Sequence, residues 1–181
     1  MCFSALAQVK PEDVANEVQA DFVDDSFEFF YWHEQPLTFT IAELFKIKGS
    51  VSDSLIKQFQ ENLVDPAEGS KWNCGEISKA KCITDSLLSD VLPSQLSAYP
   101  SKSARKKAEK KNKELLKLKV EERRVYRGSF PVYSNGSQFA LIKMKYEYGA
   151  SYYDDYVESI YVLEFQNDRW NVIKEVNIFG K

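Results

Sequence analysis

Tyrosine residues near the end of the chain form the group of side chains best suited to contact a ligand. The segment "ALIKMKYEYGASYYDDYVESIYVLEF" carries six tyrosines between Lys145 and Val162. If "KMKYEY" and "ESIYVLEF" pair as strands, the connector "GASYYDDYV" projects from the sheet. Tyrosines in such a loop offer a large amphipathic contact area at low entropic cost. We therefore predict a contact surface for a protein or glycan partner at Tyr152, Tyr153, Asp154, Asp155 and Tyr156.

The tyrosine-rich segment also has a simpler interpretation. Tyrosine has a high β-propensity, so Tyr146, Tyr148 and Tyr161 are expected to line sheet faces. Asp154 and Asp155 could help to hold a calcium ion, but adjacent carboxylates without a spaced ligand set are typical of a solvated turn. We predict no metal site and no cofactor.

Cys74 and Cys82 lie in "WNCGEISKAKC", where an oxidising compartment would allow them to close a short loop. A disulfide over a loop of this size stabilises a fold by roughly 2–3 kcal/mol in the chain-entropy model. Two unpaired core cysteines are the alternative. A zinc site is not expected, because these two cysteines and the single His33 leave it one ligand short.

Catalysis by a nucleophile has one candidate base, because His33 is the only histidine in the chain. It lies in "FYWHEQP", among aromatic residues, which indicates a packed or surface histidine. The sequence contains neither a G-x-S-x-G motif nor a glycine-rich phosphate loop. A pair of carboxylates for glycoside hydrolysis stays open, since it requires only two acids at the right separation.

The charge of the chain is unevenly distributed. The formal net charge is -3, yet eleven Lys or Arg and four Glu between Lys102 and Arg124 give a local +7 and leave -10 elsewhere. These basic residues could neutralise phosphates of a nucleic acid or an anionic membrane surface; they include Lys106, Lys107, Lys110, Lys111 and Lys113. No aromatic residue accompanies them, and Glu109 and Glu114 interrupt them. We predict a solvated helix face and no nucleic-acid partner. No apolar run approaches the roughly 18 residues of a membrane span.

The N-terminal segment "MCFSALAQVKPED" indicates the compartment. Ala5-Leu6-Ala7 shows the small-x-small pattern of a signal-peptidase site, and polar sequence follows from Gln8. We predict that residues 1–7 are a remnant of a signal peptide and that Cys2 is removed with it. An ordinary N-terminus is the alternative. Residues 8–181 then form a single exported α+β domain.

Helical spacing dominates the first two thirds of the chain. Apolar residues recur at helical spacing after Pro11 and again after Ser52 or Asp53, either of which could cap the second helix. Thr84 and Asp85 can cap a short helix that ends before Pro93. The basic stretch forms a further helix, docked mainly through Leu115, Leu116 and Leu118. Between the first two helices, alternation of Leu37, Phe39 and Ile41 predicts a short strand.

The last third of the chain is rich in β-forming residues. "RVYRGSFPVYS", "QFALIKMKYEY", "ESIYVLEF" and "RWNVIKEVNIF" read as strands, with "NG" and "QND" as hairpin turns. The sequence therefore predicts an α+β fold in which N-terminal helices pack on one face of a C-terminal antiparallel β-meander of about four strands.

This strand pattern resembles a block found in uncharacterised exported α+β proteins of Bacteroidetes-type bacteria. The similarity lies in "SFPVYSNGSQFALIKMKY" and "YVLEFQNDRWNVIKE", preceded by the connector "KWNCGEISKAKCITDSLL". It implies export and a strand-turn-strand arrangement, and it brings no catalytic motif. The connector "GASYYDDY" departs from the Gly and Cys that such proteins often place there.

The functional prediction is an exported binding or interaction protein. Two alternatives stay open. One is a carboxylate-based hydrolase, which two buried acids on a sheet face would favour. The other is a cytosolic, immunity-type partner protein that docks through its acidic remainder of -10.

Overall fold

The computed structural model describes residues 10–20, 28–118, 123–148 and 156–179. Its helices are α1 (Pro11–Ala20), α2 (Ile41–Lys46), α3 (Asp53–Asn62), α4 (Leu88–Val91) and α5 (Lys102–Leu115). Its strands are β1 (Phe30–His33), β2 (Ala80–Ile83), β3 (Val125–Gly128), β4 (Val132–Tyr133), β5 (Phe139–Glu147), β6 (Tyr156–Gln166) and β7 (Arg169–Phe179). Among the short 3-10 turns, η1 (Cys74–Glu76) precedes β2 and η2 (Asp85–Leu87) precedes α4.

The strands form one mixed sheet in the order β2-β1-β3-β5-β6-β7, and β4 also pairs with β5. β1 runs parallel to both β2 and β3. All other pairs are antiparallel. Parallel neighbours require long crossover connections, which here contain α2 and α3 between β1 and β2, and α4 and α5 between β2 and β3.

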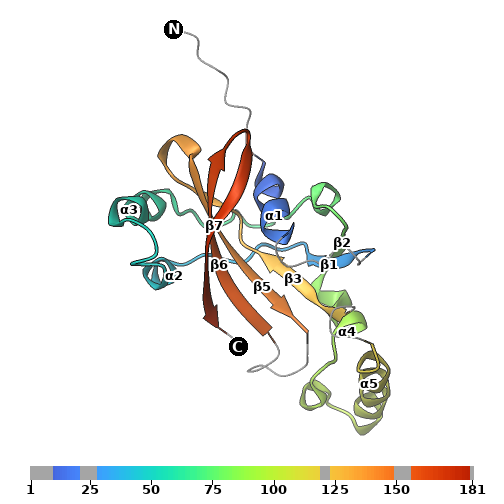
Figure 1. Cartoon of the computed structure of the whole chain (residues 1–181). Helices are drawn as coiled ribbons and strands as arrows, with labels where there is room; N and C mark the ends of the chain where they lie inside the picture. The colour runs from blue at the N-terminus through green and yellow to red at the C-terminus, as the bar shows by residue number, and fades with distance from the viewer. Residues whose placement is uncertain (1–9, 21–27, 119–122, 149–155, 180–181) are drawn as a thin grey trace.

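Helices cover both faces of this sheet (Figure 1). On the α1 face, Val14 and Val18 pack against Ile142 and Leu163 of the central strands. The opposite face is covered by α2, α3 and α4, and we call it the α3 face. There Phe59 packs with Leu141 and other apolar residues of β5 and β6. Both faces are covered because β5 and β6 carry buried apolar residues at consecutive positions.

The α+β class is confirmed, but the prediction of about four antiparallel strands is wrong in number and in kind. The prediction that the helices pack on only one face of the sheet is also wrong. One strand that we did not predict is β2, where Lys81 and Cys82 are exposed at the sheet edge and give no apolar alternation. It joins the sheet through parallel pairing with β1, which lies about fifty positions earlier in the chain.

The predicted strand at Leu37, Phe39 and Ile41 is also wrong. Leu37 makes only an isolated bridge with Ser129, and α2 begins at Ile41, whose side chain is exposed. A capping box explains this start. The backbone N–H of Thr40 donates to the carboxylate of Glu43 at 2.7 Å, and the helix is thereby favoured over a continued strand.

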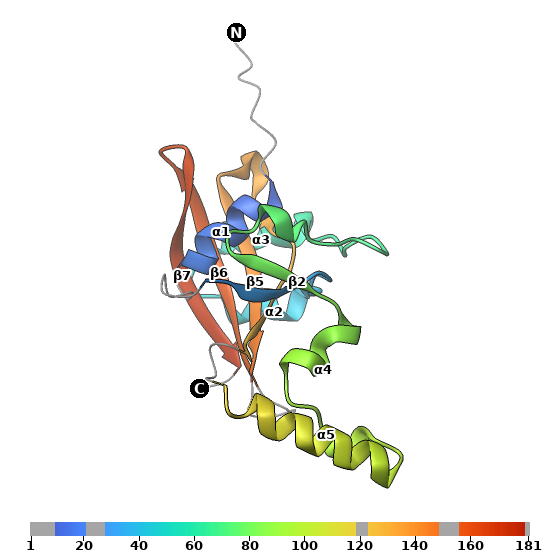
Figure 2. The ribbon, with the colours of Figure 1, turned by 90° about the vertical axis from the view of Figure 1, so that its right-hand side faces the viewer.

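The four predicted helices are confirmed as α1, α3, α4 and α5, but α5 docks differently from the prediction. α3 begins after Ser52, whose Oγ accepts a hydrogen bond from the N–H of Leu55 at 3.2 Å. α5 projects from the sheet (Figure 2) and buries Ala108 and Leu115. Leu116 and Leu118 are exposed, contrary to our prediction that they dock this helix. Both residues follow Leu115, the last residue of α5, and therefore do not lie on the buried face of the helix.

The strand turns that we predicted lie where expected. Asn167 and Asp168 both have positive φ values, 54° and 62°, and join β6 to β7 in a tight hairpin. The "NG" turn joins β4 to β5, with Gly136 at a φ of 78°. Among the described strands, β7 pairs only with β6 and forms one edge of the sheet.

Candidate functional site

The predicted tyrosine surface falls mostly outside the described residues; this applies to Tyr152, Tyr153, Asp154 and Asp155. Tyr156 is the first residue of β6. Its ring stacks on Phe179 with centroids 4.5 Å apart, and Lys145 Nζ lies 4.3 Å from the centroid of its ring. Tyr156 therefore contributes to the sheet. The binding role of the connector stays a prediction.

Two of the three flanking tyrosines belong to the sheet, as the simpler interpretation predicted, whereas Tyr148 lies directly after the end of β5. Tyr146 lies in β5, and Tyr161 is almost fully buried in β6. The hydroxyl of Tyr161 donates to Glu175 on β7 at 3.0 Å. Burial, reinforced by the nearby Glu175 carboxylate, raises the pKa of Tyr161 well above its ordinary value.

A row of charged and ionisable side chains crosses the α3 face between two apolar clusters. We call it the charged band; it comprises His33, Glu43, Asp85, Arg127, Lys143, Lys145, Glu147 and Glu158. One apolar cluster lies under α2 and α3, and the other lies beside α4. Because the strands bring these residues together from distant parts of the chain, the band is the first place to look for an active site.

His33 cannot serve as the base of such a site in this geometry. Its side chain is fully buried, and its Nδ1 accepts the backbone N–H of Gln35 at 3.2 Å. This bond assigns the proton to Nε2, which donates to Asp85 Oδ1 at 3.0 Å. Burial lowers the pKa of His33, and the positive charge of Arg127 lowers it further. The imidazole is therefore neutral with both nitrogens occupied.

The two acids beside Lys143, Glu43 and Glu158, do not resemble a hydrolase pair. Lys143 Nζ donates to Glu43 at 2.8 Å and lies 3.5 Å from Glu158, so one buried cation lies between both carboxylates. Burial raises the pKa of Glu43, but the hydrogen bonds from Lys143 and Thr40 outweigh it and leave the pKa below its ordinary value. A glycosidase acid needs a raised pKa, so the shift has the wrong sign.

Ion pairs continue through the rest of the band. Arg127 lies 3.4 Å from both Asp85 and Glu147, and Lys145 lies 2.6 Å from Glu147. Each cation of the band thus has an acidic partner. With three cations, four acids and a neutral His33, the band keeps a net charge of -1, and its ion pairs attach α2 and η2 to the sheet.

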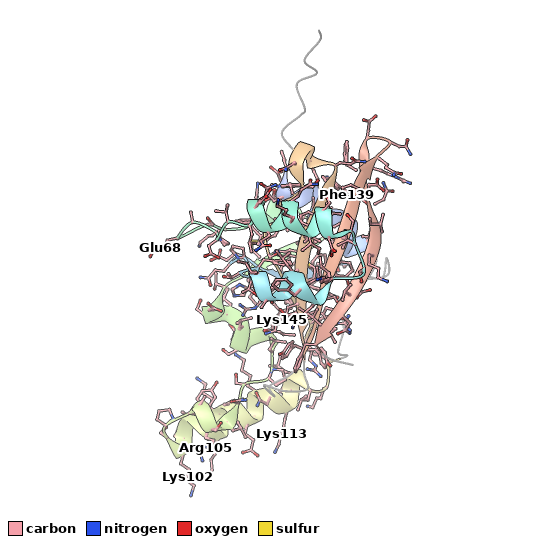
Figure 3. All side chains as sticks on the ribbon, turned by 90° about the vertical axis from the view of Figure 1, so that its left-hand side faces the viewer. Glu68, Lys102, Arg105, Lys113, Phe139 and Lys145 are labelled. Atoms are coloured by element: carbon pink, nitrogen blue, oxygen red, sulfur yellow. A yellow bond between two sulfur atoms is a disulfide. The ribbon has the colours of Figure 1, made fainter. Side chains whose placement is uncertain are left out.

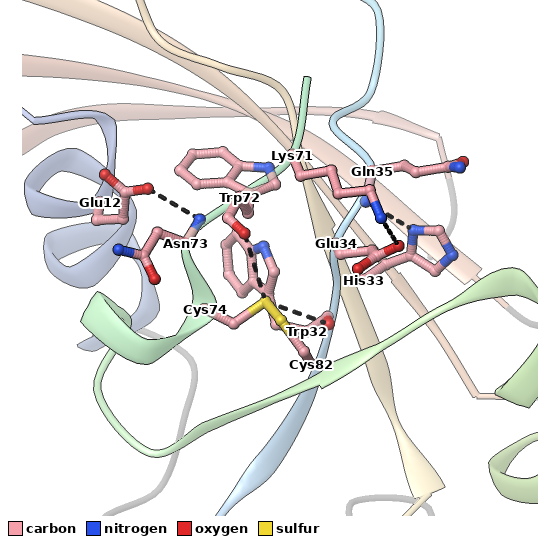
Figure 4. The surroundings of a disulfide bond; sticks show 10 residues. All are labelled: Glu12, Trp32, His33, Glu34, Gln35, Lys71, Trp72, Asn73, Cys74 and Cys82. Atoms are coloured by element: carbon pink, nitrogen blue, oxygen red, sulfur yellow. Dashed lines mark hydrogen bonds and ion pairs between the residues drawn. A yellow bond between two sulfur atoms is a disulfide. The ribbon is translucent and has the colours of Figure 1, made fainter. Parts of the chain in front are cut away.

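The disulfide prediction is confirmed. Cys74 and Cys82 are bonded, and the bond lies beside Trp32 and Trp72 (Figure 4). Cys74 is buried, whereas Cys82 is exposed on β2. Trp72 Nε1 donates to the carbonyl oxygen of Gly128 at 3.0 Å, so the disulfide segment is attached to β3.

The solvent side of α5 carries charges of a different kind. Lys102, Lys106, Lys110 and Lys113 follow one another at intervals of four, four and three residues, which places them on one stripe of the helix. We call it the lysine stripe. All four are exposed, and at about 1.5 Å per residue they extend over about 17 Å. Figure 3 labels Lys102 and Lys113, the two ends of the stripe. Lys113 lies 3.7 Å from Glu109, while the other three make no ion pair with any residue that the structure describes.

Lys107 and Lys111, the other two lysines that we considered in this segment, do not belong to the lysine stripe. Lys107 lies off the stripe, and Lys111 is held by an ion pair with Asp90 beneath the helix. We did not recognise the stripe from the sequence, although the four-four-three spacing was visible there. A helical projection of residues 102–115 would have separated docking lysines from exposed ones.

A small cavity lies between α3 and the turn that joins β4 to β5. Its volume is about 260 Å³, and its lining is uncharged: Ser52, Ser54, Leu55, Gln58, Ser134, Asn135, Gln138 and Phe139. No local sequence signal predicts it, because its two walls are about eighty positions apart in the chain.

Comparison of this chain with family models, with curated proteins and with solved structures gives no match. The resemblance to exported bacterial proteins therefore stays a prediction. Within the described parts of the chain, no three His, Cys, Asp or Glu side chains gather in a way that could hold a metal ion. None of the helices described is long and apolar enough to cross a membrane.

Proposed function

We propose that this chain is an exported binding protein that holds an anionic partner on the lysine stripe of α5. The observation that carries the proposal is the stripe itself, in which Lys102, Lys106 and Lys110 are exposed and form no ion pair with the described residues, although Lys110 interacts electrostatically with Glu114. Surface charges of one sign, presented together, attract a partner of the opposite sign and accelerate the encounter.

The contrast with the charged band supports a contact role for α5. The two lysines of the charged band, Lys143 and Lys145, are buried or half-buried and paired with acids, whereas those of the stripe face solvent on a helix that projects from the sheet (Figure 2). The protein as a whole is acidic, with a net charge of -3, so the stripe is a local exception. A partner that carries closely spaced negative charges on a glycan or protein suits it best.

Export is supported by the disulfide between Cys74 and Cys82. Such bonds persist in oxidising compartments and are rare where glutathione and thioredoxin keep thiols reduced. The signal-peptide remnant predicted at residues 1–7 lies outside the described residues and stays a prediction.

Binding to dextran sulfate, with uncharged dextran as reference, tests the anionic partner. Replacement of Lys102, Lys106 and Lys110 by glutamine should weaken binding about 100-fold, at about 1 kcal/mol for each lysine near an anionic surface. Raising the salt concentration should weaken binding by the native protein and have less effect on the variant.

A matched control removes three positive charges elsewhere. Lys46, Lys48 and Lys174 are exposed on α2, in the turn after it and on β7. Their triple glutamine variant should bind dextran sulfate like the native protein. Equal weakening in both variants would mean that net charge and not the stripe attracts the polymer, and the proposal would be abandoned.

The tyrosine connector is a second predicted contact surface, and its test should spare Tyr156. The ring of Tyr156 stacks on Phe179, so a change there disturbs the sheet. A Tyr152→Ser, Tyr153→Ser double variant should keep the melting temperature of the native protein and lose capture of its partner. A large fall in melting temperature would instead mark these two tyrosines as structural.

A further inference from the structure

We infer that the cavity between α3 and the β4–β5 turn binds a single neutral sugar residue. This site is separate from the lysine stripe and does not depend on it. Its volume of about 260 Å³ lies just below the usual range for drug-sized ligands, so it suits a ligand of about one ring. Figure 3 shows Phe139, one of its lining residues, at the α3 end of the sheet.

The two walls of the cavity are fastened to each other. The backbone N–H of Asn135 donates to Gln58 Oε1 at 3.1 Å. Asn62 Nδ2 donates to Asn135 Oδ1 at 3.0 Å and to the carbonyl oxygen of Tyr133 at 2.9 Å. Two residues of α3, Gln58 and Asn62, thus hydrogen-bond to the turn. The cavity is therefore formed before a ligand binds, and binding requires little ordering of the protein.

These same bonds orient the side-chain amides. The oxygen of Gln58 is occupied by Asn135, and the oxygen of Asn135 is occupied by Asn62. The free end of each of these two amides is therefore its NH₂ group, which makes no hydrogen bond with the residues that the structure describes. Two amide donors thus lie in the lining, at positions set by the fold.

Hydroxyl groups add further hydrogen-bonding capacity. The Oγ atoms of Ser52 and Ser134 accept backbone N–H groups, from Leu55 at 3.2 Å and from Phe139 at 2.9 Å, so each hydroxyl keeps its proton to donate. Ser54 adds a third hydroxyl to the lining. A ligand with several oxygen atoms around a small ring satisfies such a set of donors.

The uncharged lining selects a neutral ligand. Every lining side chain is polar and uncharged or apolar, so no ion pair would compensate a buried ligand charge. Leu55 and Phe139 supply the apolar part, against which the C–H face of a sugar ring can pack. A neutral sugar combines these two requirements, oxygen atoms at its rim and an apolar face.

Nuclear magnetic resonance of the ¹⁵N-labelled protein tests this inference directly. Glucose, galactose, mannose and N-acetylglucosamine are titrated separately, and the side-chain NH₂ signals of Gln58 and Asn135 are followed. At least one sugar should shift both signals along a saturable curve, together with the backbone signal of Ser54. Failure of all four sugars to shift these signals would overturn the inference.

A conservative variant separates recognition from folding. Gln58→Glu keeps an oxygen for the N–H of Asn135 but removes the NH₂ donor, so the fold should persist while the dissociation constant rises at least tenfold. Gln60→Glu makes the same charge change on an exposed position of α3 and should bind like the native protein. Unchanged binding by Gln58→Glu would overturn the inference.

Inorganic phosphate and acetate provide the last comparison. If either anion shifts the signals of Gln58 and Asn135 and no sugar does, the cavity is an anion site and the neutral-sugar inference is wrong. The glutamine variant of Lys102, Lys106 and Lys110 should bind the sugar normally. The proposed function and this inference can therefore fail independently.

Discussion

Removal of the disulfide by Cys82→Ala gives a direct measure of what the Cys74–Cys82 loop contributes. The bonded residues are 8 positions apart. For a loop of this size the chain-entropy model gives a stabilisation of about 2.5 kcal/mol at room temperature. Cys82 is exposed, so alanine there opens no cavity in the core. The buried Cys74 is left as a thiol, which packs like a small apolar side chain.

Urea unfolding followed by tryptophan fluorescence provides the assay. Trp32 and Trp72 lie beside Cys74, so their emission reports the unfolding of this region (Figure 4). The unfolding free energy of Cys82→Ala should fall by about 2.5 kcal/mol relative to the oxidised native protein. The native protein measured in reductant should show the same loss, because it lacks the same bond.

The control is Ser78→Ala, an exposed position within the same loop, which should leave the unfolding free energy unchanged. A loss below about 1 kcal/mol in Cys82→Ala would refute the entropic reasoning, since the loop would then be ordered without its bond. A loss above about 4 kcal/mol would also refute the entropic reasoning, because it exceeds what closure of so short a loop can contribute. The bond would then also hold the pairing of β2 with β1.

Three further outcomes follow from the same structure. Gly128→Ala places a methyl group 2.9 Å from the ring of buried Trp32 and should lower the unfolding free energy by about 1–3 kcal/mol. Gly75→Ala, whose new methyl group has its nearest contact at 3.5 Å, should change it little. The urea concentrations at the unfolding midpoints of the two variants test this difference. The folded-state pKa of His33 is lowered, so the unfolded chain takes up the proton first as the pH falls. Stability should therefore decrease below about pH 6.5, by at most about 1.4 kcal/mol per pH unit, and His33→Gln should flatten this dependence. Asp168→Gly relieves a φ of 62°, a conformation that costs a non-glycine residue about 1–2 kcal/mol, but the glycine adds about 0.4–1 kcal/mol of freedom to the unfolded chain. The melting temperature should therefore rise by a small net amount, and no gain would mean that the hairpin turn is not strained.

Local signals in the sequence predicted the elements that local chemistry controls. Of the two predicted caps, Ser52 and Asp53, Ser52 caps α3, and the "NG" and "QND" segments contain the expected turns. The strand predicted near Leu37 failed because the Thr40–Glu43 capping box was overlooked, although both residues are visible at the required spacing. The preference for a strand from three alternating apolar residues was weaker than the preference for a helix from the two hydrogen bonds of the capping box.

Features that depend on distant residues were beyond a reading of local patterns. The parallel pairing of β1 with β2 joins segments about fifty positions apart, and the cavity joins Gln58 to Asn135. Neither leaves a periodicity or a motif in the sequence. The charged band was likewise hidden, since Lys143 meets its partner Glu43 from a hundred positions away. Charge patterns predict such a band only after the strand order is known.

The position of β1 between β2 and β3 also decides when the chain can fold. β1 is made early in synthesis, but its parallel partners begin at Ala80 and Val125, so its two neighbours are absent while the first third of the chain emerges. The hairpin of β6 and β7, by contrast, closes within microseconds once its residues exist. Contacts of such long sequence separation form late and slowly. We therefore expect folding to nucleate in the C-terminal hairpins, and a nascent chain without them lacks β3, one of the two strands that flank β1.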